Sequence, residues 1–443
     1  MNKLTEPQLS SNDDYDVPAG VLDNLMFMRY AHIYRNRTSG GIEQYLRHLD
    51  SGLLLRHRLT ILQMHLIREN ENDAIEVEDI GLGRILWIPV AIRQASSRLA
   101  DLPGRLAYML NRSHFRLQDE AKDRRIQILP SVRGMSYRWG AHLRHNAAIF
   151  SDRLHCMLKT QKIDLLSLHW MSYDAIPLIK NAIKSGVPYV FINHFDNEKL
   201  SPSTTRKWLD RAAAIGVVST LNIPEDLQSR CFNLSDAVDT EYFTLEKARP
   251  MSIAADPIVL LPARIVEQKG HRDLIEAARI LIDRKIDLAI YFVGAVDSES
   301  LHQELRRLAA KAGIEERVLF LGEKSADEIR NCYAVSSVVV LPSYSEGLPR
   351  VLLEAQSMEK PIVAYDSGGI KEAILPGETG FLVSTGDISA LVDKLAFLLQ
   401  NESERRRIGK RGREFVSHKF SISSLIKRHE SFYYKALFHK NSC

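Results

Sequence analysis

The second half of the chain alternates short apolar runs with amphipathic segments, and this alternation constrains the fold more than any other feature. The apolar runs lie at 258–262, 288–293, 318–321, 338–341, 361–364 and 381–383. Helical periodicity marks the segments at 273–282, 299–312, 325–333, 349–358, 370–374 and 388–399. Short continuous apolar runs are typical of strands buried on both faces, and strand–helix alternation predicts a parallel sheet between helices. We therefore expect an α/β domain over residues 257–400.

The first half repeats this pattern less regularly. Strands are expected at 25–28, 59–66, 84–88, 164–169, 188–193 and 213–218, with helices at 42–55, 141–159 and 173–184. The first strand and helix flank a turn containing Gly40 and Gly41, where backbone can approach a ligand closely or simply reverse direction. No GxGxxG fingerprint follows the first strand. The prediction is a second Rossmann-like domain over residues 21–245.

The remaining segments organise these two domains. Residues 246–257 are rich in small residues and proline and are predicted to form the linker. Helices at 405–418 and 421–438, within the final segment 401–443, are expected to pack back over the hinge. The first 20 residues are polar and acidic, which is typical of a disordered tail and not of a signal peptide.

Composition excludes some classes of protein. A chain of 443 residues is long enough for two or three domains, and a net charge of +4 does not by itself call for nucleic acid. The four cysteines have no CxxC or metal-ligand spacing, which favours reduced thiols in a cytoplasmic protein. No apolar run is as long as a membrane span.

One stretch, from Ser345 to Glu354, carries the strongest functional signal. It follows an expected strand and opens an expected helix, in which Pro349 suits the first helical position. The N–H groups of Arg350 and Val351 then point out of the helix start, where an anion is favoured. Glu346 and Glu354 flank this turn. They could accept hydrogen bonds from the hydroxyl groups at the two ends of a nucleotide diphosphate sugar. The alternative is a pair of solvated carboxylates.

Further candidates stand at other strand ends. Arg264 and Lys269 follow the first strand of the second domain, where two cations suit a diphosphate. Ser367-Gly368-Gly369 forms a glycine turn on the same edge. His194 follows a strand of the first domain and would face it across a cleft. Solvated cations and a structural histidine are the plain alternatives.

Taken together, these motifs resemble the large fourth family of retaining glycosyltransferases, the glycosyl transferases group 1, which have the GT-B fold of two Rossmann-like domains. The similarity is strongest in PARIVEQKG from Pro262, SYSEGLPRVLLEA from Ser343 and GETGFLV from Gly377. It is looser at Ser39-Gly40-Gly41 and Asn193-His194, and DAVD from Asp236 is similar to the junction motif between the domains. Pro349 stands where many relatives have glycine.

The resemblance implies roles for individual residues. Arg264 and Lys269 would hold the diphosphate, Glu354 the ribose, Glu346 the donor sugar, and His194 would reach the sugar from the first domain. The implied catalytic residues are Glu346, His194, Arg264 and Lys269. The implied donor-binding residues are Gly40, Gly41, Arg264, Lys269, Glu346, Gly347, Leu348, Arg350, Val351 and Glu354.

The expected activity is transfer of a hexosyl unit, with retention, from a nucleotide diphosphate sugar to a saccharide or lipid-linked acceptor. Polysaccharide or glycolipid biosynthesis is the expected setting. No metal or cofactor is expected, because Arg264, Lys269 and a helix dipole would replace the metal, and UDP is favoured over GDP. Two alternatives stay open: a non-catalytic nucleotide-sugar-binding scaffold protein and a sugar-nucleotide epimerase of the same fold.

Residues 84–144 carry a local basic excess that no named motif explains. Twelve Lys and Arg stand there against four Asp and Glu, interleaved with apolar residues. This pattern is typical of segments that lie on an anionic membrane surface. We expect it to flank the acceptor site at the inner face of the membrane, making this cytoplasmic protein peripheral. A solvated helical insertion is the alternative.

Overall fold

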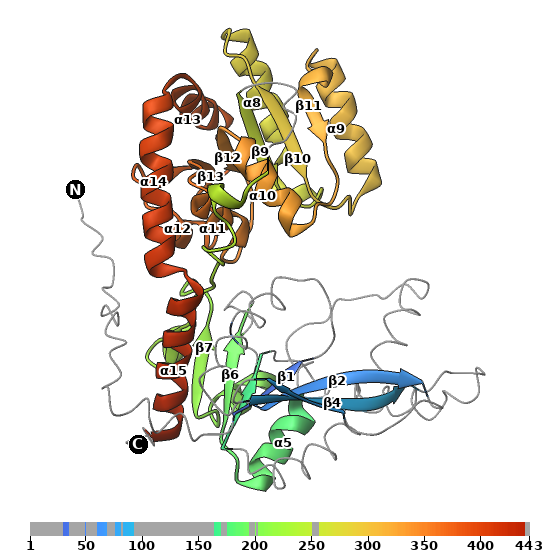
Figure 1. The fold of residues 1–443 in the computed structure, drawn as a ribbon, viewed down its shortest axis with the longest axis vertical. Helices are drawn as coiled ribbons and strands as arrows, with labels where there is room; N and C mark the ends of the chain where they lie inside the picture. The colour runs from blue at the N-terminus through green and yellow to red at the C-terminus, as the bar shows by residue number, and fades with distance from the viewer. Residues whose placement is uncertain are drawn as a thin grey trace.

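The computed structural model contains two sheets of mostly parallel strands, which lie one above the other in Figure 1. Two long C-terminal helices run alongside both sheets. The structure describes residues 30–34, 49, 60–68, 76–80, 83–92, 164–169, 175–194, 200, 203–249 and 257–438. Gly40, Gly41, the expected strand at 25–28, the tail 1–20 and residues 93–144 of the basic stretch lie outside these ranges.

The second sheet has six parallel strands in the order β11-β10-β9-β12-β13-β14. Its strands are β9 Ile258–Pro262, β10 Ala289–Val293, β11 Val318–Phe320, β12 Val338–Leu341, β13 Ile362–Tyr365 and β14 Gly380–Val383. The helices between them are α8 His271–Asp283, α9 Glu299–Lys311, α10 Ala326–Val335, α11 Arg350–Ser357, α12 Ile370–Ala373 and α13 Ile388–Gln400. Every predicted strand and helix of this half is therefore present. The strand order reverses between β9 and β12, where open α/β sheets bind ligands.

Burial explains this regularity. Strands β9, β10, β12 and β13 are buried along their whole length, so both faces of each are apolar and covered by helices. Helix α10 begins at a capping box in which Ser325 and Glu328 satisfy each other's backbone N–H groups. Sequence periodicity and caps thus agree at each element, which is why the predicted bounds lie close to those observed.

The first sheet has eight strands in the order β3-β4-β2-β1-β5-β6-β7-β8. They are β1 Tyr30–Tyr34, β2 Thr60–Arg68, β3 Glu76–Ile80, β4 Gly83–Ile92, β5 Leu165–Leu168, β6 Tyr189–Asn193, β7 Ala214–Val217 and β8 Cys231–Asn233. Helices α5 Ala175–Ser185, α6 Ser203–Leu209 and α7 Glu225–Gln228 follow in this half. Apart from β3, whose pairing with β4 is antiparallel, the described strands run parallel, and the order reverses between β1 and β5.

Three differences from the sequence predictions appear in this sheet. Strand β1 lies at 30–34, after the predicted strand at 25–28, in residues that we did not predict to be strand. Strand β3 was not predicted, because its charged residues hide the alternation typical of a strand. Strand β4 extends to Ile92, so the first part of the basic stretch belongs to the sheet and not to an insertion.

Two C-terminal helices join the halves. Helix α14 Glu402–Lys419 runs beside the second sheet and packs on α11, and α15 Ile422–Phe438 continues beside the first sheet (Figure 1). Leu425, Phe432 and Tyr433 of α15 complete the core on one face of the first sheet. The end of the chain therefore lies against its first half. None of the helices in the described ranges is long and apolar enough to cross a membrane.

Candidate functional site at the facing edges of the two sheets

Lys269 and Glu346 meet at the point where the strand order of the second sheet reverses. Lys269 follows β9 and Glu346 follows β12, and these strands are neighbours in the sheet. The Lys269 ammonium forms an ion pair with Glu346 Oε1. Both side chains are largely buried, with exposed fractions of 16% and 11%. Two residues predicted to act at different parts of a donor are therefore direct partners.

Backbone contacts between the two turns place this pair. The Tyr344 N–H donates to Gln268 O over 2.8 Å, and the Ser343 hydroxyl donates to the same oxygen over 3.0 Å. Gly270 has a φ of +68°, and a Cβ there would lie 1.9 Å from Pro342 O. Only glycine fits this close approach, which fixes Lys269 beside the turn that carries Glu346.

The glycine turn after β13 supports Glu346 from the other side. The Gly369 N–H donates to Glu346 O over 3.1 Å. A Cβ at Gly368 would lie 2.0 Å from that same oxygen, and one at Gly369 would lie 2.2 Å from Gly347 O. These glycines therefore allow one turn to pack on another.

Helix α11 begins one residue later than predicted. Pro349 is the residue before the helix, with an extended ψ of 111°, and Arg350 is the first helical residue. The first intrahelical hydrogen bond runs from Leu352 N–H to Pro349 O over 3.1 Å. The N–H groups of Arg350 and Val351 precede that bond, so the predicted anion-binding amides stand at the helix start even though the proline lies outside it.

Glu354 lies in a buried cluster behind this helix start. The Tyr333 hydroxyl donates to Glu354 Oε2 over 3.0 Å, and Glu354 is only 9% exposed. Arg350 Nη1 lies 3.2 Å from Asp236 Oδ1 in the segment that joins the two sheets. Burial raises the pKa of both Glu354 and Asp236, while Arg350 opposes that rise. The Arg350 side chain therefore binds the interdomain junction.

Arg264 stands at the mouth of the site. Its Nη1 lies 2.5 Å from Asp297 Oδ2, on the loop after β10. The side chain is 60% exposed, against 16% for Lys269. Arg264 is therefore free to exchange its partner for a ligand at low cost, since an exposed ion pair contributes little to stability.

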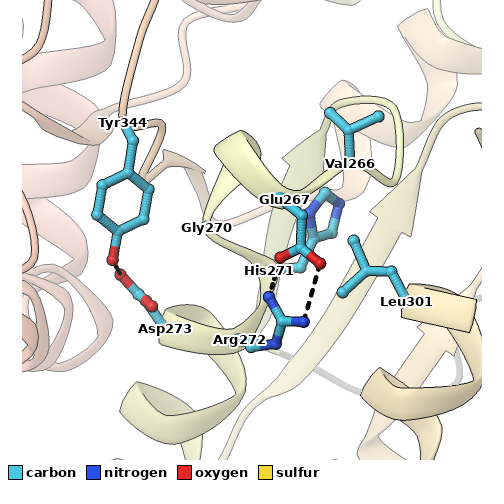
Figure 2. Close-up of a pocket in the computed structure, with 8 residues that line it drawn as sticks. All are labelled: Val266, Glu267, Gly270, His271, Arg272, Asp273, Leu301 and Tyr344. Atoms are coloured by element: carbon cyan, nitrogen blue, oxygen red, sulfur yellow. Dashed lines mark hydrogen bonds and ion pairs between the residues drawn. The ribbon is translucent and has the colours of Figure 1, made fainter. Parts of the chain in front are cut away.

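A hollow of about 240 Å³ adjoins the turn that carries Lys269 (Figure 2). Tyr344 donates to Asp273 over 2.7 Å on one side of it, and Arg272 is ion-paired with Glu267 on the other. Asp273 and Arg272 are therefore already engaged, by Tyr344 and Glu267 respectively. Lys269 and Glu346 do not line the hollow.

On the first sheet, His194 follows β6 and His169 follows the adjacent strand β5. His169 Nδ1 lies 3.1 Å from His194 Nε2, and the rings stack with centroids 5.4 Å apart. Burial lowers the pKa of His194 to about 3, so its imidazole is neutral at pH 7. Gly40 and Gly41, predicted beside it, lie outside the described residues.

The carboxyl edges of the two sheets touch each other. Glu372 of α12, which follows the glycine turn of the second sheet, accepts hydrogen bonds from the Ser219 hydroxyl over 2.5 Å and from Thr220 N–H over 3.0 Å. Ser219 follows β7, the neighbour of β6. The edge that carries His194 and the edge that carries Glu346 therefore face the same space between the sheets.

Several residues of this site were not predicted. His169, Asp297, Tyr333 and Glu372 each hold or orient a predicted residue or join the two edges. His169 could have been found by a criterion close to the one that selected His194, since it is the last residue of an expected strand and His194 directly follows another. The partnerships of Tyr333 and Glu372 depend on tertiary packing and have no local signal.

Gly347 and Leu348 complete the predicted donor-binding set, between Glu346 and the start of α11. A Cβ at Gly347 would have open space around it, so the backbone there is accessible on that side. Within the described ranges, no group of three or more His, Cys, Asp or Glu side chains is arranged to hold a metal ion.

Comparison with known proteins shows what the second half of this chain is similar to. Residues 246–415 match the model described as glycosyl transferases group 1. The chain is 31% identical over 170 residues to the capsular polysaccharide biosynthesis glycosyltransferase CapM of Staphylococcus aureus, covering 38% of this chain and 44% of CapM. It is 36% identical over 170 residues to the N-acetyl-alpha-D-glucosaminyl L-malate synthase of Bacillus anthracis, covering 38% and 43%. The matches thus span less than half the length of these curated relatives.

Solved structures match the whole fold. A glycosyltransferase from Rickettsia africae superimposes with a TM-score of 0.64 at 18% identity, covering 94% of this chain and 100% of that one. HepE from Anabaena, solved with UDP and glucose, superimposes with a TM-score of 0.62 at 16% identity, covering 91% and 98%. Residues 246–415 are therefore similar to the glycosyl transferases group 1 family, and the two sheets of the chain have the GT-B fold of these solved glycosyltransferases.

Proposed function

We propose that this protein is a retaining glycosyltransferase that moves a hexosyl unit from a nucleotide diphosphate sugar to a saccharide or lipid-linked acceptor. The observation that carries the proposal is the Lys269–Glu346 pair beside the start of α11, at the point where the strand order reverses. An ammonium and unbonded helix N–H groups suit a diphosphate, and a carboxylate suits sugar hydroxyls. The family of residues 246–415 supports the same reading.

The diphosphate would enter by replacing carboxylates as partners of the cations. Lys269 would exchange Glu346 for phosphate oxygen, and Arg264 would exchange Asp297. Glu346 would then be free to accept hydrogen bonds from the donor sugar. Donor binding and release of the catalytic carboxylate are thereby the same event, because the cation that holds the phosphate is the one that held Glu346.

Transfer would then need charge stabilisation at the leaving phosphate. As the bond from the anomeric carbon to the phosphate oxygen breaks, negative charge builds on that oxygen next to Lys269, Arg264 and the start of α11. The acceptor hydroxyl would attack from the same face and pass its proton to the leaving phosphate. The sugar therefore keeps its anomeric configuration. His194, neutral at pH 7, would contribute a hydrogen bond from the opposite edge without adding charge.

A donor panel tests the proposal. Uridine and guanosine diphosphate sugars would be incubated with saccharide and lipid-linked acceptors, and nucleotide release would be measured with and without each acceptor. We expect acceptor-dependent release, highest with a UDP-sugar, and a product that keeps the donor's anomeric configuration by NMR. An inverted product would contradict the retaining mechanism. Donor binding without release or bond formation would instead indicate a scaffold protein, and release of an epimerised sugar nucleotide an epimerase.

Independence from metal is a separate part of the proposal. Its motive is the presence of Lys269, Arg264 and the helix start at the proposed phosphate site. Transfer should continue in excess EDTA at an undiminished rate. Activity that disappears with EDTA and returns only with added divalent cation would contradict it.

Residues 84–144 are proposed to flank the acceptor site on an anionic membrane surface, which would place the protein at the cytoplasmic face of the membrane. The support is the local excess of eight positive charges in a chain of net charge +4. Liposome co-sedimentation should show binding to anionic vesicles that falls with salt and weakens when Arg98, Arg105, Arg112 and Arg116 are changed to Glu. Equal binding to neutral vesicles, or an unaffected mutant, would make the stretch a solvated insertion.

A further inference from the structure

A line of hydrogen bonds runs from the C-terminal helix to His194. The Tyr433 hydroxyl of α15 donates to Ser167 Oγ over 3.3 Å. Ser167 Oγ lies 3.1 Å from His169 Nε2, and His169 Nδ1 lies 3.1 Å from His194 Nε2. Four side chains from two strands' ends and one helix thus connect the returning helix to the facing edge of the first sheet.

Burial makes these bonds obligatory. The exposed fractions are 0% for Ser167, 2% for His169 and 1% for Tyr433. Polar groups this deeply buried are costly to leave without a hydrogen bond. Burial also lowers the pKa of His194 to about 3, so its ring is neutral and carries one proton on one nitrogen. Which nitrogen carries it depends on the bond that the other nitrogen makes.

We assign the direction of the line from its first donor, the Tyr433 hydroxyl. Because Ser167 Oγ accepts from Tyr433, its own hydrogen is available to His169 Nε2. A neutral His169 that accepts at Nε2 has its proton on Nδ1 and donates it to His194 Nε2. A neutral His194 that accepts at Nε2 must in turn have its proton on Nδ1.

We propose that His169 is a positioning residue that, with Ser167 and Tyr433, holds His194 as the tautomer with its proton on Nδ1. In the proposed transfer reaction, on which this role rests, His194 would then give a sugar oxygen an uncharged N–H donor of fixed orientation. A cation at this position would raise the cost of the positive charge that develops on the sugar ring, and the other tautomer would present an acceptor in place of the N–H. The role also explains why a helix from the end of the chain completes this edge.

The tautomer can be measured without any substrate. In protein with 15N-labelled histidine, the ring nitrogens of His194, assigned by the loss of their signals in His194→Asn, report directly which nitrogen bears hydrogen. We expect a protonated Nδ1 and an unprotonated Nε2 across pH 6 to 8. Proton on Nε2 in the wild type would overturn the proposal.

Variants at His169 test whether the line sets this state. His169→Asn keeps an amide N–H near the place of Nδ1, and His169→Leu removes every donor. We expect the Leu variant to lose the single-tautomer spectrum and to lower kcat about tenfold with the donor KM little changed, the loss typical of one hydrogen bond. The Asn variant should regain most of both. An unchanged His194 spectrum in His169→Leu would overturn the proposal.

Tyr433→Phe removes the first donor of the line, and Tyr434→Phe, next to it on α15, is the matched control. The first should weaken the preference of His194 for one tautomer, and the second should not. Equal spectra for both would overturn the role of Tyr433 as first donor. If His194 shows the expected tautomer but no donor is turned over, the proposed function fails while the positioning of His194 stands.

Discussion

The two facing edges have similar sheet topology and opposite chemistry. Each lies where the strand order reverses, between β1 and β5 in the first sheet and between β9 and β12 in the second. The second edge presents ion pairs, Lys269 with Glu346 and Arg264 with Asp297. The first presents two stacked imidazoles, His169 and His194, linked by a hydrogen bond, and His194 is neutral at pH 7. Both edges therefore lie where open α/β sheets bind ligands, and they differ in the charge of their strand-end residues.

The difference matches the two ends of a nucleotide sugar. A diphosphate needs cations and N–H groups, which the second edge concentrates, whereas a sugar ring that develops positive charge needs uncharged donors and acceptors. The buried cluster of Asp236, Arg350 and Glu354 lies at the junction of the two domains. A change at the charged edge should therefore affect nucleotide binding, and a change at the neutral edge should affect turnover.

The largest effect is expected at Glu346, which belongs to the charged edge and is proposed to bind the donor sugar. Glu346→Gln keeps the size of the side chain and removes its charge, so we expect kcat to fall on the order of 10²–10³-fold, as for other groups that act on a transition state. Glu316→Gln, at an exposed position, is the control. Turnover near the wild-type value in Glu346→Gln would remove this residue from the mechanism.

The next comparison is between the two cations. Lys269→Ala should raise the Kd for nucleoside diphosphate about ten- to a hundredfold, the contribution of a partly buried charge-assisted hydrogen bond. Arg264→Ala should have a smaller effect, since its side chain is 60% exposed. Titration calorimetry would measure both. The opposite ranking would show that the mouth of the site, and not the buried pair, holds the phosphate.

A smaller effect is expected on stability, from the glycine turn that supports Glu346. In Gly369→Ala the new methyl group would lie 2.2 Å from Gly347 O, so the backbone must shift, at about 1–3 kcal/mol. Gly347→Ala has open space at its Cβ and should leave the unfolding temperature unchanged. Calorimetric scans of both would decide. Equal unfolding temperatures would mean that the backbone of the turn shifts without a loss of free energy of unfolding.

The smallest effect is expected on the pH dependence of the unfolding temperature. The pKa of His194 is lowered from the usual 6.5 to about 3. Between pH 6.5 and 3 the imidazole is therefore protonated in the unfolded chain and neutral in the folded protein. The folded protein loses stability as the pH falls through this range. Burial raises the pKa of Glu354, so its proton is bound by the folded protein first and acidification stabilises it. The unfolding temperature of His194→Asn should fall less than that of the wild type between pH 7 and 4.5, and that of Glu354→Gln should fall more. Parallel curves for the three proteins would contradict both assignments.

The fold of the second half could be predicted almost completely because its signals are local. Apolar strands such as 338–341, the capping box at Ser325 and the glycine turns each report on their own segment. The first half was less predictable, since β3 is charged and its place depends on pairing with β4.

The candidate site divides in the same way. The positions of Arg264, Lys269, Glu346 and His194 follow from the rule that functional groups stand at the carboxyl ends of parallel strands. Their partners do not, because Asp297 and His169 reach them through the packing of other elements. The contact of Tyr333 with Glu354 depends on tertiary packing in the same way. The sequence thus indicated the groups that could meet a ligand, while the structure was needed to show that Lys269 and Glu346 already hold each other.

The most direct test of the division between the two edges is titration calorimetry of UDP with wild type, Lys269→Ala and His194→Asn. The account predicts that Lys269→Ala weakens UDP binding at least tenfold, the value of one charge-assisted hydrogen bond. It predicts an unchanged Kd for His194→Asn, together with a lowered kcat in the transfer assay. Undiminished binding in Lys269→Ala, or a loss in His194→Asn as large as that in Lys269→Ala, would contradict the assignment of the nucleotide to the second edge.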